Sequence, residues 1–340
     1  MALGIFKALP PYFGGKRALT AQIFRHVPPP AEAPVFVDAF MGGGSVALYA
    51  KARGYQVIAN DIAERSAIVG RAVIANSTMR LHEDDVRVLL APHPASDGYV
   101  ERTYASDHFL PRHARIIDGA LAHARSAANP VRRDLLLLAT IHFIVRWRPF
   151  GDFHQPGLIH KVVAGDCNNL NPNVYRVKLT TLFKHPSPER MRVILRDLNA
   201  GVFSNGHANA MHQQDVFDFL SAVEGDVLYL DPPYWGSNAY EKVYRVLDSI
   251  LAGREVERTV SRFNRSEAKQ ALLDLLVQAT RFPVWVLSFG GGRIDAEECR
   301  EMVARFRPAE VIPVRHRYHY AEAGGQRADA KEILVIGRAA

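Results

Sequence analysis

The stretch Val227-Leu228-Tyr229-Leu230-Asp231-Pro232-Pro233-Tyr234 decides how the whole chain is interpreted. Its first four residues are typical of a buried β-strand. The prolines end that strand, because each fixes φ and neither donates a backbone hydrogen bond. The residue before each proline is held extended, so the acid, the prolines and the aromatic residue form a stiff, projecting turn. Carboxylate and carbonyl oxygens beside a flat ring suit a planar ligand with an exocyclic amine, such as a nucleobase. The alternative is a strand-ending turn with a capping Asp231 and a packed Tyr234.

A second strand followed by a turn lies upstream, at residues 35–50. The strand ends in Asp38, and Gly42, Gly43 and Gly44 then form a turn before a helical pattern. Glycines allow the backbone to turn sharply into a helix and to approach a bound ligand closely. We therefore expect a ligand-binding turn here.

The next predicted strand lies within residues 54–61 and ends in Asp61, about 20 residues after Gly42. An acid at this place in a βαβ unit is positioned to bond ribose hydroxyls. Residues 35–61 therefore predict a nucleotide-binding half of an α/β fold. The alternative is a βαβ crossover without a ligand.

Two further segments have both a functional and a structural interpretation. Gly14-Gly15-Lys16 predicts a turn at a helix start, which can bind an anion through backbone N–H groups and the lysine ammonium. It lacks the complete phosphate-loop pattern, so a plain N-terminal turn is the alternative. Asp215 precedes an apolar helix and is suited to capping it or to accepting a hydrogen bond from an adenine amine; one residue can do both.

The remaining chain alternates between helical and strand-like segments. Residues 82–107 and 235–262 are polar and are interpreted as mixed or connecting segments, and His142 is interpreted as a packed core residue. Helices are expected at 63–76, 107–128, 129–148, 266–280 and 295–305, and strands near 202–204, at 283–289, at 310–315 and at 332–336.

Composition indicates a globular protein with a net positive charge. The 340 residues carry a formal charge of +7, with a pI near 9.4. Residues 101–200 hold 15 Lys/Arg and 8 Asp/Glu, a difference of +7 that equals the excess of the whole chain. A polyanion is the expected partner, and a solvated basic face is the alternative. Cys167 and Cys299 have no metal-ligand spacing and fit a reducing cytoplasm. No membrane-spanning run or signal peptide is seen.

The order of these elements resembles that of amino-group DNA methyltransferases of the alpha group, and within it the Dam-like, D12-class adenine-N6 methyltransferases. In this order G-G-K comes first, the Phe40-Met-Gly-Gly-Gly turn next, then a long basic insert and D-P-P-Y, and finally Lys331-Glu-Ile-Leu-Val-Ile. The resemblance implies a Rossmann-like methyltransferase sheet with an inserted, mainly helical DNA-recognition domain. We expect the catalytic domain at 1–76 and 202–340 and the insert at 77–201.

The resemblance also implies a role for individual residues. Asp231, Pro232, Pro233 and Tyr234 would hold a flipped-out adenine for transfer of a methyl group to N6. S-adenosylmethionine would be bound by Tyr12, Lys16, Asp38, Phe40, Gly42, Gly43, Gly44, Asp61 and Asp215. Among these, Lys16 would lie near its carboxylate, Asp61 would take its ribose hydroxyls, and Asp215 its adenine amine.

Other expectations follow from the same resemblance. The partner is double-stranded DNA, no metal or membrane is involved, and the location is the cytoplasm of a bacterium or a phage host. A restriction–modification setting is implied, while the recognition sequence and the oligomeric state, monomer included, stay open. The alternatives are a cytosine-N4 methyltransferase and a catalytically inert DNA-binding protein that keeps the fold. Asp231 favours adenine as the target base, since the cytosine group more often has S-P-P-Y at this place. It also disfavours a protein-glutamine methyltransferase, since that family has N-P-P-Y.

Overall fold

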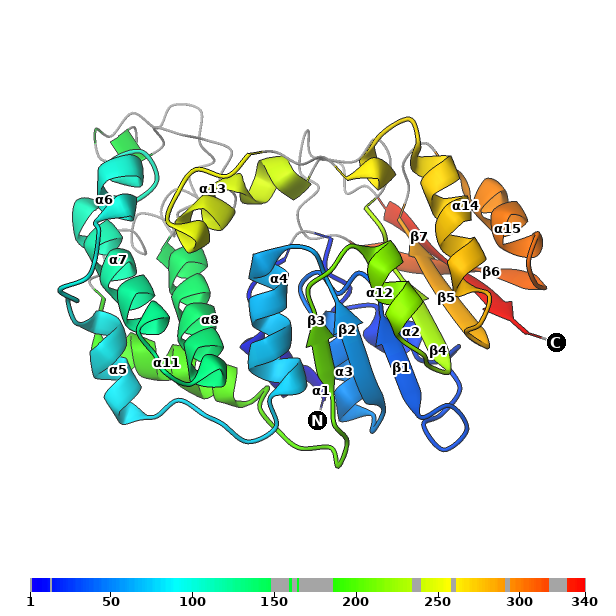
Figure 1. Ribbon diagram of the computed structural model, residues 1–340, viewed down its shortest axis with the longest axis horizontal. Coiled ribbons are helices and arrows are strands. Elements are labelled where there is room, and N and C mark those ends of the chain that lie inside the picture. The colour runs from blue at the N-terminus through cyan, green and yellow to red at the C-terminus, as the bar shows by residue number, and fades with distance from the viewer. Residues whose placement is uncertain are drawn as a thin grey trace.

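The computed structural model describes residues 2–12, 14–147, 159–160, 164, 186–233, 240–257, 261–290, 294–317 and 329–339. One seven-stranded sheet forms the centre of the molecule, and helices cover both of its faces (Figure 1). The strands are β1 (Val35–Asp38), β2 (Gln56–Asn60), β3 (Ala210–His212), β4 (Val227–Leu230), β5 (Val284–Phe289), β6 (Ala309–Arg317) and β7 (Asp329–Arg338). The predicted α/β class with a Rossmann-like sheet is confirmed.

Helices occupy most of the remaining described chain. Those that pack around the sheet are α1 (Ala2–Ile5), η1 (Phe6–Ala8), α2 (Thr20–Ile23), α3 (Ser45–Ala52), α4 (Glu64–Val69), the π-helix η2 (Gly70–Ala75), α12 (Val216–Ala222), α13 (Tyr240–Ala252), η3 (Arg262–Asn264), α14 (Ala268–Ala279) and α15 (Ala296–Ala304). Those of the predicted insert are α5 (Glu83–Leu90), α6 (Tyr99–Tyr104), α7 (Pro111–Arg125), α8 (Pro130–Trp147) and α11 (Pro188–Asn199).

The strand order is β3-β2-β1-β4-β5-β7-β6. Strands β1 to β5 run parallel, and β7 is antiparallel to both of its neighbours. The chain adds β2 and β3 on one side of β1, and then returns to place β4 and β5 on the other side. The order therefore reverses between β1 and β4, and ligands of open α/β sheets bind at the carboxyl ends of the strands at such a point.

Both faces of the central strands are buried, as expected of a parallel sheet. On one face, strand residues such as Phe36 and Val57 pack against η1, α2, α3 and η2. On the other face, Val37 and Leu228 pack against α12, α14 and α15. Because alternate residues face opposite layers, the short strands need apolar residues at nearly every position, and this explains their continuous hydrophobic runs.

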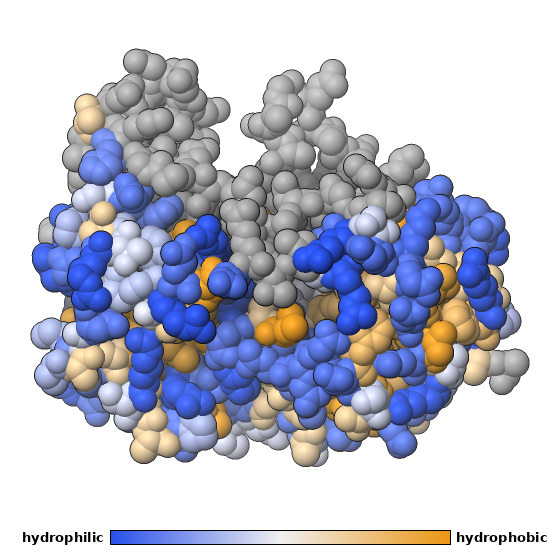
Figure 2. All heavy atoms as spheres, turned by 45° about the horizontal axis from the view of Figure 1, so that its top comes forward, coloured by the Kyte–Doolittle hydropathy of each residue, from blue (hydrophilic) through white to orange (hydrophobic). Residues whose placement is uncertain are grey.

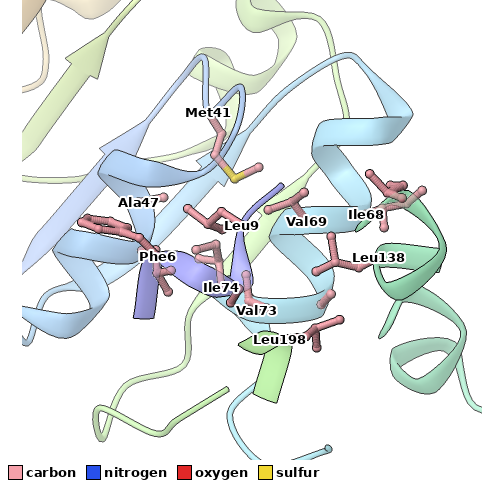
Figure 3. Close-up of a cluster of buried hydrophobic side chains, with 14 of the residues drawn as sticks. Phe6, Leu9, Met41, Ala47, Ile68, Val69, Val73, Ile74, Leu138 and Leu198 are labelled. Atoms are coloured by element: carbon pink, nitrogen blue, oxygen red, sulfur yellow. The ribbon is translucent and has the colours of Figure 1, made fainter. Parts of the chain in front are cut away.

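The helices of residues 77–201 extend the core of the first face. Figure 3 shows Leu138 of α8 and Leu198 of α11 in one cluster with Val69 and Val73 of the α4–η2 segment and with Leu9. His142 of α8 is also buried, and its Nε2 lies 2.9 Å from the carbonyl oxygen of Ala8, which agrees with the predicted core role. The helical segment therefore shares a hydrophobic core with the nucleotide-binding half. Its separate role in DNA recognition remains a prediction.

Two segments that were interpreted as polar connections contain helices. Residues 82–107 include α5 and α6, and residues 235–262 include α13. Helix α6 is short, and its first turn depends on a distant carboxylate: Asp118 of α7 accepts the N–H groups of Val100 and Glu101 at 2.8 and 2.9 Å. Such tertiary capping leaves no local pattern in the sequence.

Two predicted positions are shifted. The helix expected near Lys16 begins at Thr20, and residues 17–19 before it form a turn. The strand expected near Val202 begins only at Ala210, where β3 pairs with β2. The segment before β3 is instead held by side chains, since Asn205 donates to the carbonyl oxygens of Lys51 and Tyr55.

Candidate active site

The glycine turn lies at the carboxyl end of β1 and requires its glycines. Gly42 and Gly44 have φ of 54° and 76°, in the left-handed region that favours glycine. A Cβ on Gly43 would lie 2.5 Å from the Cβ of Tyr12, so the residue also permits close packing of Tyr12 on the turn. The tyrosine of the N-terminal segment and the glycine turn thus form one wall.

A cavity of about 800 Å³ opens at the carboxyl ends of the strands, beside the β1–β4 switch point. In Figure 2 this edge is turned forward, and a small exposed hydrophobic group lies among mostly hydrophilic side chains. The predicted site residues that line the cavity are Tyr12, Lys16, Phe40, Gly42, Gly43, Asp61, Asp215, Asp231 and Pro233. The turn after β4 and the glycine turn therefore share one opening.

Three predicted site residues of the described chain do not line this cavity. Gly44 begins α3 below the turn, and Pro232 is buried. Asp38 is also buried at the end of β1, where burial and the charges of Asp231 and Asp61 raise the pKa of its carboxyl well above the ordinary range. Asp38 and Gly44 thus lie at the two ends of the glycine turn, and their role toward a cofactor stays a prediction. Tyr234 lies outside the described residues.

Asp61 and Asp215 stand on neighbouring strand ends across the cavity. Asp61 accepts the N–H groups of Gly42 and Ala63 at 2.8 and 2.9 Å, and so ties the glycine turn to the end of β2. Asp215 caps α12 by accepting the N–H of Phe217 at 3.0 Å, which confirms the capping interpretation. Both carboxylates still line the cavity and keep lone pairs for a ligand.

Buried Asn60 fixes the spacing between these two acids. Its side-chain amide donates to the carbonyl oxygens of Ala39 and Gln214, at 3.4 and 3.2 Å, and its oxygen accepts the N–H of Gln214 at 3.1 Å. The ends of β1, β2 and β3 are therefore linked by one side chain.

Lys16 lies between two carboxylates. Its Nζ is 3.1 Å from Oδ1 of Asp231 and 3.0 Å from Oε1 of Glu332 on β7. The same Glu332 oxygen accepts a hydrogen bond from Ser288 of β5 at 2.8 Å. The ammonium thus contacts the acid of the D-P-P-Y turn directly, and the sequence interpretation assigned no role to Glu332 or Ser288.

The structure adds a third group of site residues from α4 and α13. Arg65 of α4 forms an ion pair with Asp248 of α13 at 2.5 Å, and its guanidinium lies 4.4 Å from the ring centroid of Tyr244. Tyr244 in turn stacks on Tyr12, with 5.2 Å between ring centroids. Helix α13 is therefore a wall of the cavity, although its sequence predicted a connection.

Ile62 was also missed by the sequence interpretation. It follows Asp61 directly, lines the cavity and is 67 % exposed, which is unusual for a large hydrophobic side chain. Its position after the strand-ending acid was the available signal, because the next residue of such a turn projects from the same edge of the sheet.

Among the residues that the structure describes, none of the helices combines the length and the hydrophobicity that a membrane span requires. The same residues contain no group of three or more His, Cys, Asp or Glu side chains placed to hold a metal ion. Cys299 is a free, buried cysteine, and Cys167 lies outside the described residues.

Comparison with known families agrees with this geometry. A sequence model described as D12 class N6 adenine-specific DNA methyltransferase matches residues 12–117, which include the Tyr12–Lys16 turn, the glycine turn and Asp61. Over these residues the chain is similar to the D12 class. The match ends within α7 and does not include the turn after β4.

Three Type II methyltransferases are similar to longer parts of the chain. The Type II methyltransferase M2.HphI of Haemophilus parahaemolyticus is 27 % identical over 330 residues, which cover 96 % of each protein. The Type II methyltransferase M.NlaIII of Neisseria lactamica is 24 % identical over 309 residues, covering 85 % of this chain and 84 % of the relative. The Type II methyltransferase M.FokI of Planomicrobium okeanokoites is 26 % identical over 222 residues, 64 % of this chain and 33 % of the relative.

Proposed function

We propose that this protein is a site-specific DNA methyltransferase that transfers a methyl group from S-adenosylmethionine to N6 of adenine. One observation carries the proposal: the acid after β4 and the glycine turn after β1 line the same cavity at the switch point of the sheet. A methyl donor and a base amine must meet within one opening, and this cavity holds the groups suited to each.

The cavity fits a nucleoside-containing cofactor. Asp61 would accept the ribose hydroxyls, Asp215 the adenine amine, and the exposed Ile62 side chain would cover a face of the adenine ring. Tyr12, Phe40, Gly42 and Gly43 would surround the methionine portion, with Lys16 near its carboxylate. When bound, S-adenosylmethionine supplies an electrophilic methyl group on a sulfonium.

The target adenine must leave the duplex, because its amine is otherwise paired. Tyr234 would stack on the extruded base, for a gain of about 1–3 kcal/mol. The carboxylate of Asp231 and the backbone carbonyl of Pro232 would accept the two amine hydrogens. Acceptors placed in this way direct the nitrogen lone pair away from the ring and toward the methyl donor.

Positioning and electrostatics then account for most of the expected rate. The contact with Lys16 would hold the Asp231 carboxylate in place at the cavity. We further propose that residues 1–76 and 202–340 carry out the transfer, and that residues 77–201 contact double-stranded DNA through their basic excess.

The test is product analysis on DNA. Purified protein would be incubated with duplex DNA and methyl-labelled cofactor, and the nucleosides separated by liquid chromatography and mass spectrometry. N6-methyladenine at one sequence context is expected. N4-methylcytosine would overturn the choice of base, and cofactor binding without a modified base would support an inert DNA-binding protein.

A further inference from the structure

The buried contact between Lys16 and Glu332 has no part in the function proposed so far. Both side chains are buried: 4 % of the Lys16 side chain and 1 % of the Glu332 side chain are exposed. Burying an ammonium and a carboxylate is costly unless they are paired and hydrogen-bonded. A pair retained at this depth beside Asp231 indicates that the position of the ammonium matters.

The two partners of Lys16 differ in how firmly they are held. Glu332 and Ser288 project from β7 and β5, which pair in antiparallel register along six residues, including Ser288 opposite Leu334. Asp231 instead lies on the turn after β4 and is 18 % exposed. The sheet therefore fixes Glu332, Glu332 fixes the ammonium, and the ammonium reaches the less constrained carboxylate.

We propose that Glu332 is a positioning residue for methyl transfer: together with Ser288 it holds Lys16, and Lys16 holds the Asp231 carboxylate toward the target amine. The inference rests on the function proposed above. It places a requirement for catalysis on the closing strand of the sheet, about 100 residues after the D-P-P-Y turn in the sequence.

The cost of losing this support is a misplaced acceptor. A displacement of about 1 Å at a reacting group costs up to roughly 100-fold in rate. Both Lys16 and Ser288 contact the same Oε1 atom of Glu332. Glutamine can present an oxygen in that place, whereas alanine cannot, so the two substitutions separate position from charge.

The experiment compares Glu332→Ala, Glu332→Gln and wild type in single-turnover methylation of duplex DNA, with cofactor affinity measured by calorimetry. We expect the Glu332→Ala rate at saturating cofactor to fall 10- to 100-fold. Its cofactor Kd should rise by a smaller factor, because Lys16 is also proposed to lie near the cofactor's carboxylate. Glu332→Gln should stay within about threefold of wild type in both quantities. Ile336→Ala, a buried position on the same strand, is the matched control and should keep the wild-type rate.

Two further measurements test the chain of contacts itself. In a Lys16→Met background, adding Glu332→Ala should lower the rate by less than threefold, because the group that Glu332 holds is already gone. Independently of activity, modification of Lys16 by an amine-directed reagent, followed by mass spectrometry, should be at least tenfold faster in Glu332→Ala than in wild type.

Each outcome bears on the inference. An unchanged rate of Glu332→Ala at saturating cofactor, additive losses in the double variant, or an equal loss in Ile336→Ala would overturn it. DNA methylation by the wild type would in each case leave the proposed function intact. A wild-type protein that modifies no DNA would instead overturn the proposed function and, with it, this inference.

Discussion

At the scale of single residues, Asp231 is the group on which the proposed chemistry depends. It extends from the end of β4 into the cavity, and Lys16 contacts its Oδ1 at 3.1 Å. Its neighbour Asp38 is buried, and the raised pKa of that carboxyl favours the uncharged form. Two acids close together therefore have different roles, because one is covered by the sheet and the other faces the cavity.

We expect Asp231→Ala to lower methyl transfer at least 100-fold, since one preorganised acceptor in such a site contributes about 10²–10³ in rate. Cofactor affinity should change little, because the proposed cofactor contacts lie on other strands. Single-turnover kinetics and calorimetry measure the two quantities. Asp218→Ala on the exposed face of α12 is the control, and full activity of Asp231→Ala would contradict the role.

At the scale of elements, α13 lines the cavity and contacts α4 and the N-terminal segment. The Arg65–Asp248 ion pair and the stacking of Tyr244 on Tyr12 connect three segments that are far apart in the sequence. The position of Tyr12 on the glycine turn thus depends on α13.

Asp248→Asn should therefore raise the Kd for S-adenosylmethionine about tenfold, because loss of the ion pair loosens the wall that holds Tyr12. Calorimetric titration measures this change. The matched control is Glu255→Gln, which removes the charge from an exposed ion pair with Arg245. If both variants raised the Kd equally, the contact between α4 and α13 would have no special role in cofactor binding.

Another element-scale feature is the buried Lys51 of α3, which ends the π-helix η2. Its Nζ donates to the carbonyl oxygens of Val73 and Asn76 at 2.9 and 2.8 Å. Burial lowers the pKa of the ammonium from 10.5 to about 8. Between these two values the unfolded chain binds more protons than the folded one, so this group makes stability rise with pH in that window.

The difference in unfolding free energy between wild type and Lys51→Met should accordingly move in favour of wild type by up to about 1.4 kcal/mol per pH unit above pH 8. Below pH 8 the difference should be constant, because the lysine is protonated in both states. Urea titrations of both proteins from pH 7 to 10 measure it. A constant difference throughout would mean that Lys51 is not desolvated.

At the scale of the whole molecule, charge separates the two expected functions. The excess of +7 positive charges in the whole chain equals that of residues 101–200. The cavity, in contrast, is lined by residues outside this segment. Several arginines of this segment are used internally, such as Arg132 with Asp85 and Arg192 with Glu83. We expect other basic residues of this segment to contact phosphates.

DNA binding should therefore weaken steeply with salt, with a slope near −0.9 per phosphate contact in a plot of log affinity against log salt. Replacing Arg176, Lys178 and Lys184 together by glutamine should make the slope shallower by about 2–3. Fluorescence anisotropy with a labelled duplex measures both. Arg305→Gln at the end of α15 is the control. An affinity that does not depend on salt would show that the basic residues of 101–200 do not contact DNA phosphates.

Much of the fold was predictable because its signals are local. Strands β1, β2, β4 and β5 have continuous apolar runs, and Asp61 lies at the expected distance from Gly42. Helix α6 was not predictable, because its first turn is capped by the distant Asp118, and the position of α13 depends on Arg65. The roles assigned to the site residues remain predictions that the variants above test.

The sequence by itself determined the class of fold, the two acid-bearing turns and the order in which they occur, because prolines, glycines and apolar runs restrict the backbone locally. Only the tertiary structure decided which side chains meet. The pairing of β7 with β5 brings Glu332 to Lys16, and the packing of α13 brings Tyr244 to Tyr12. Contacts between residues hundreds of positions apart arise from the path of the chain through the sheet, and no local pattern records them.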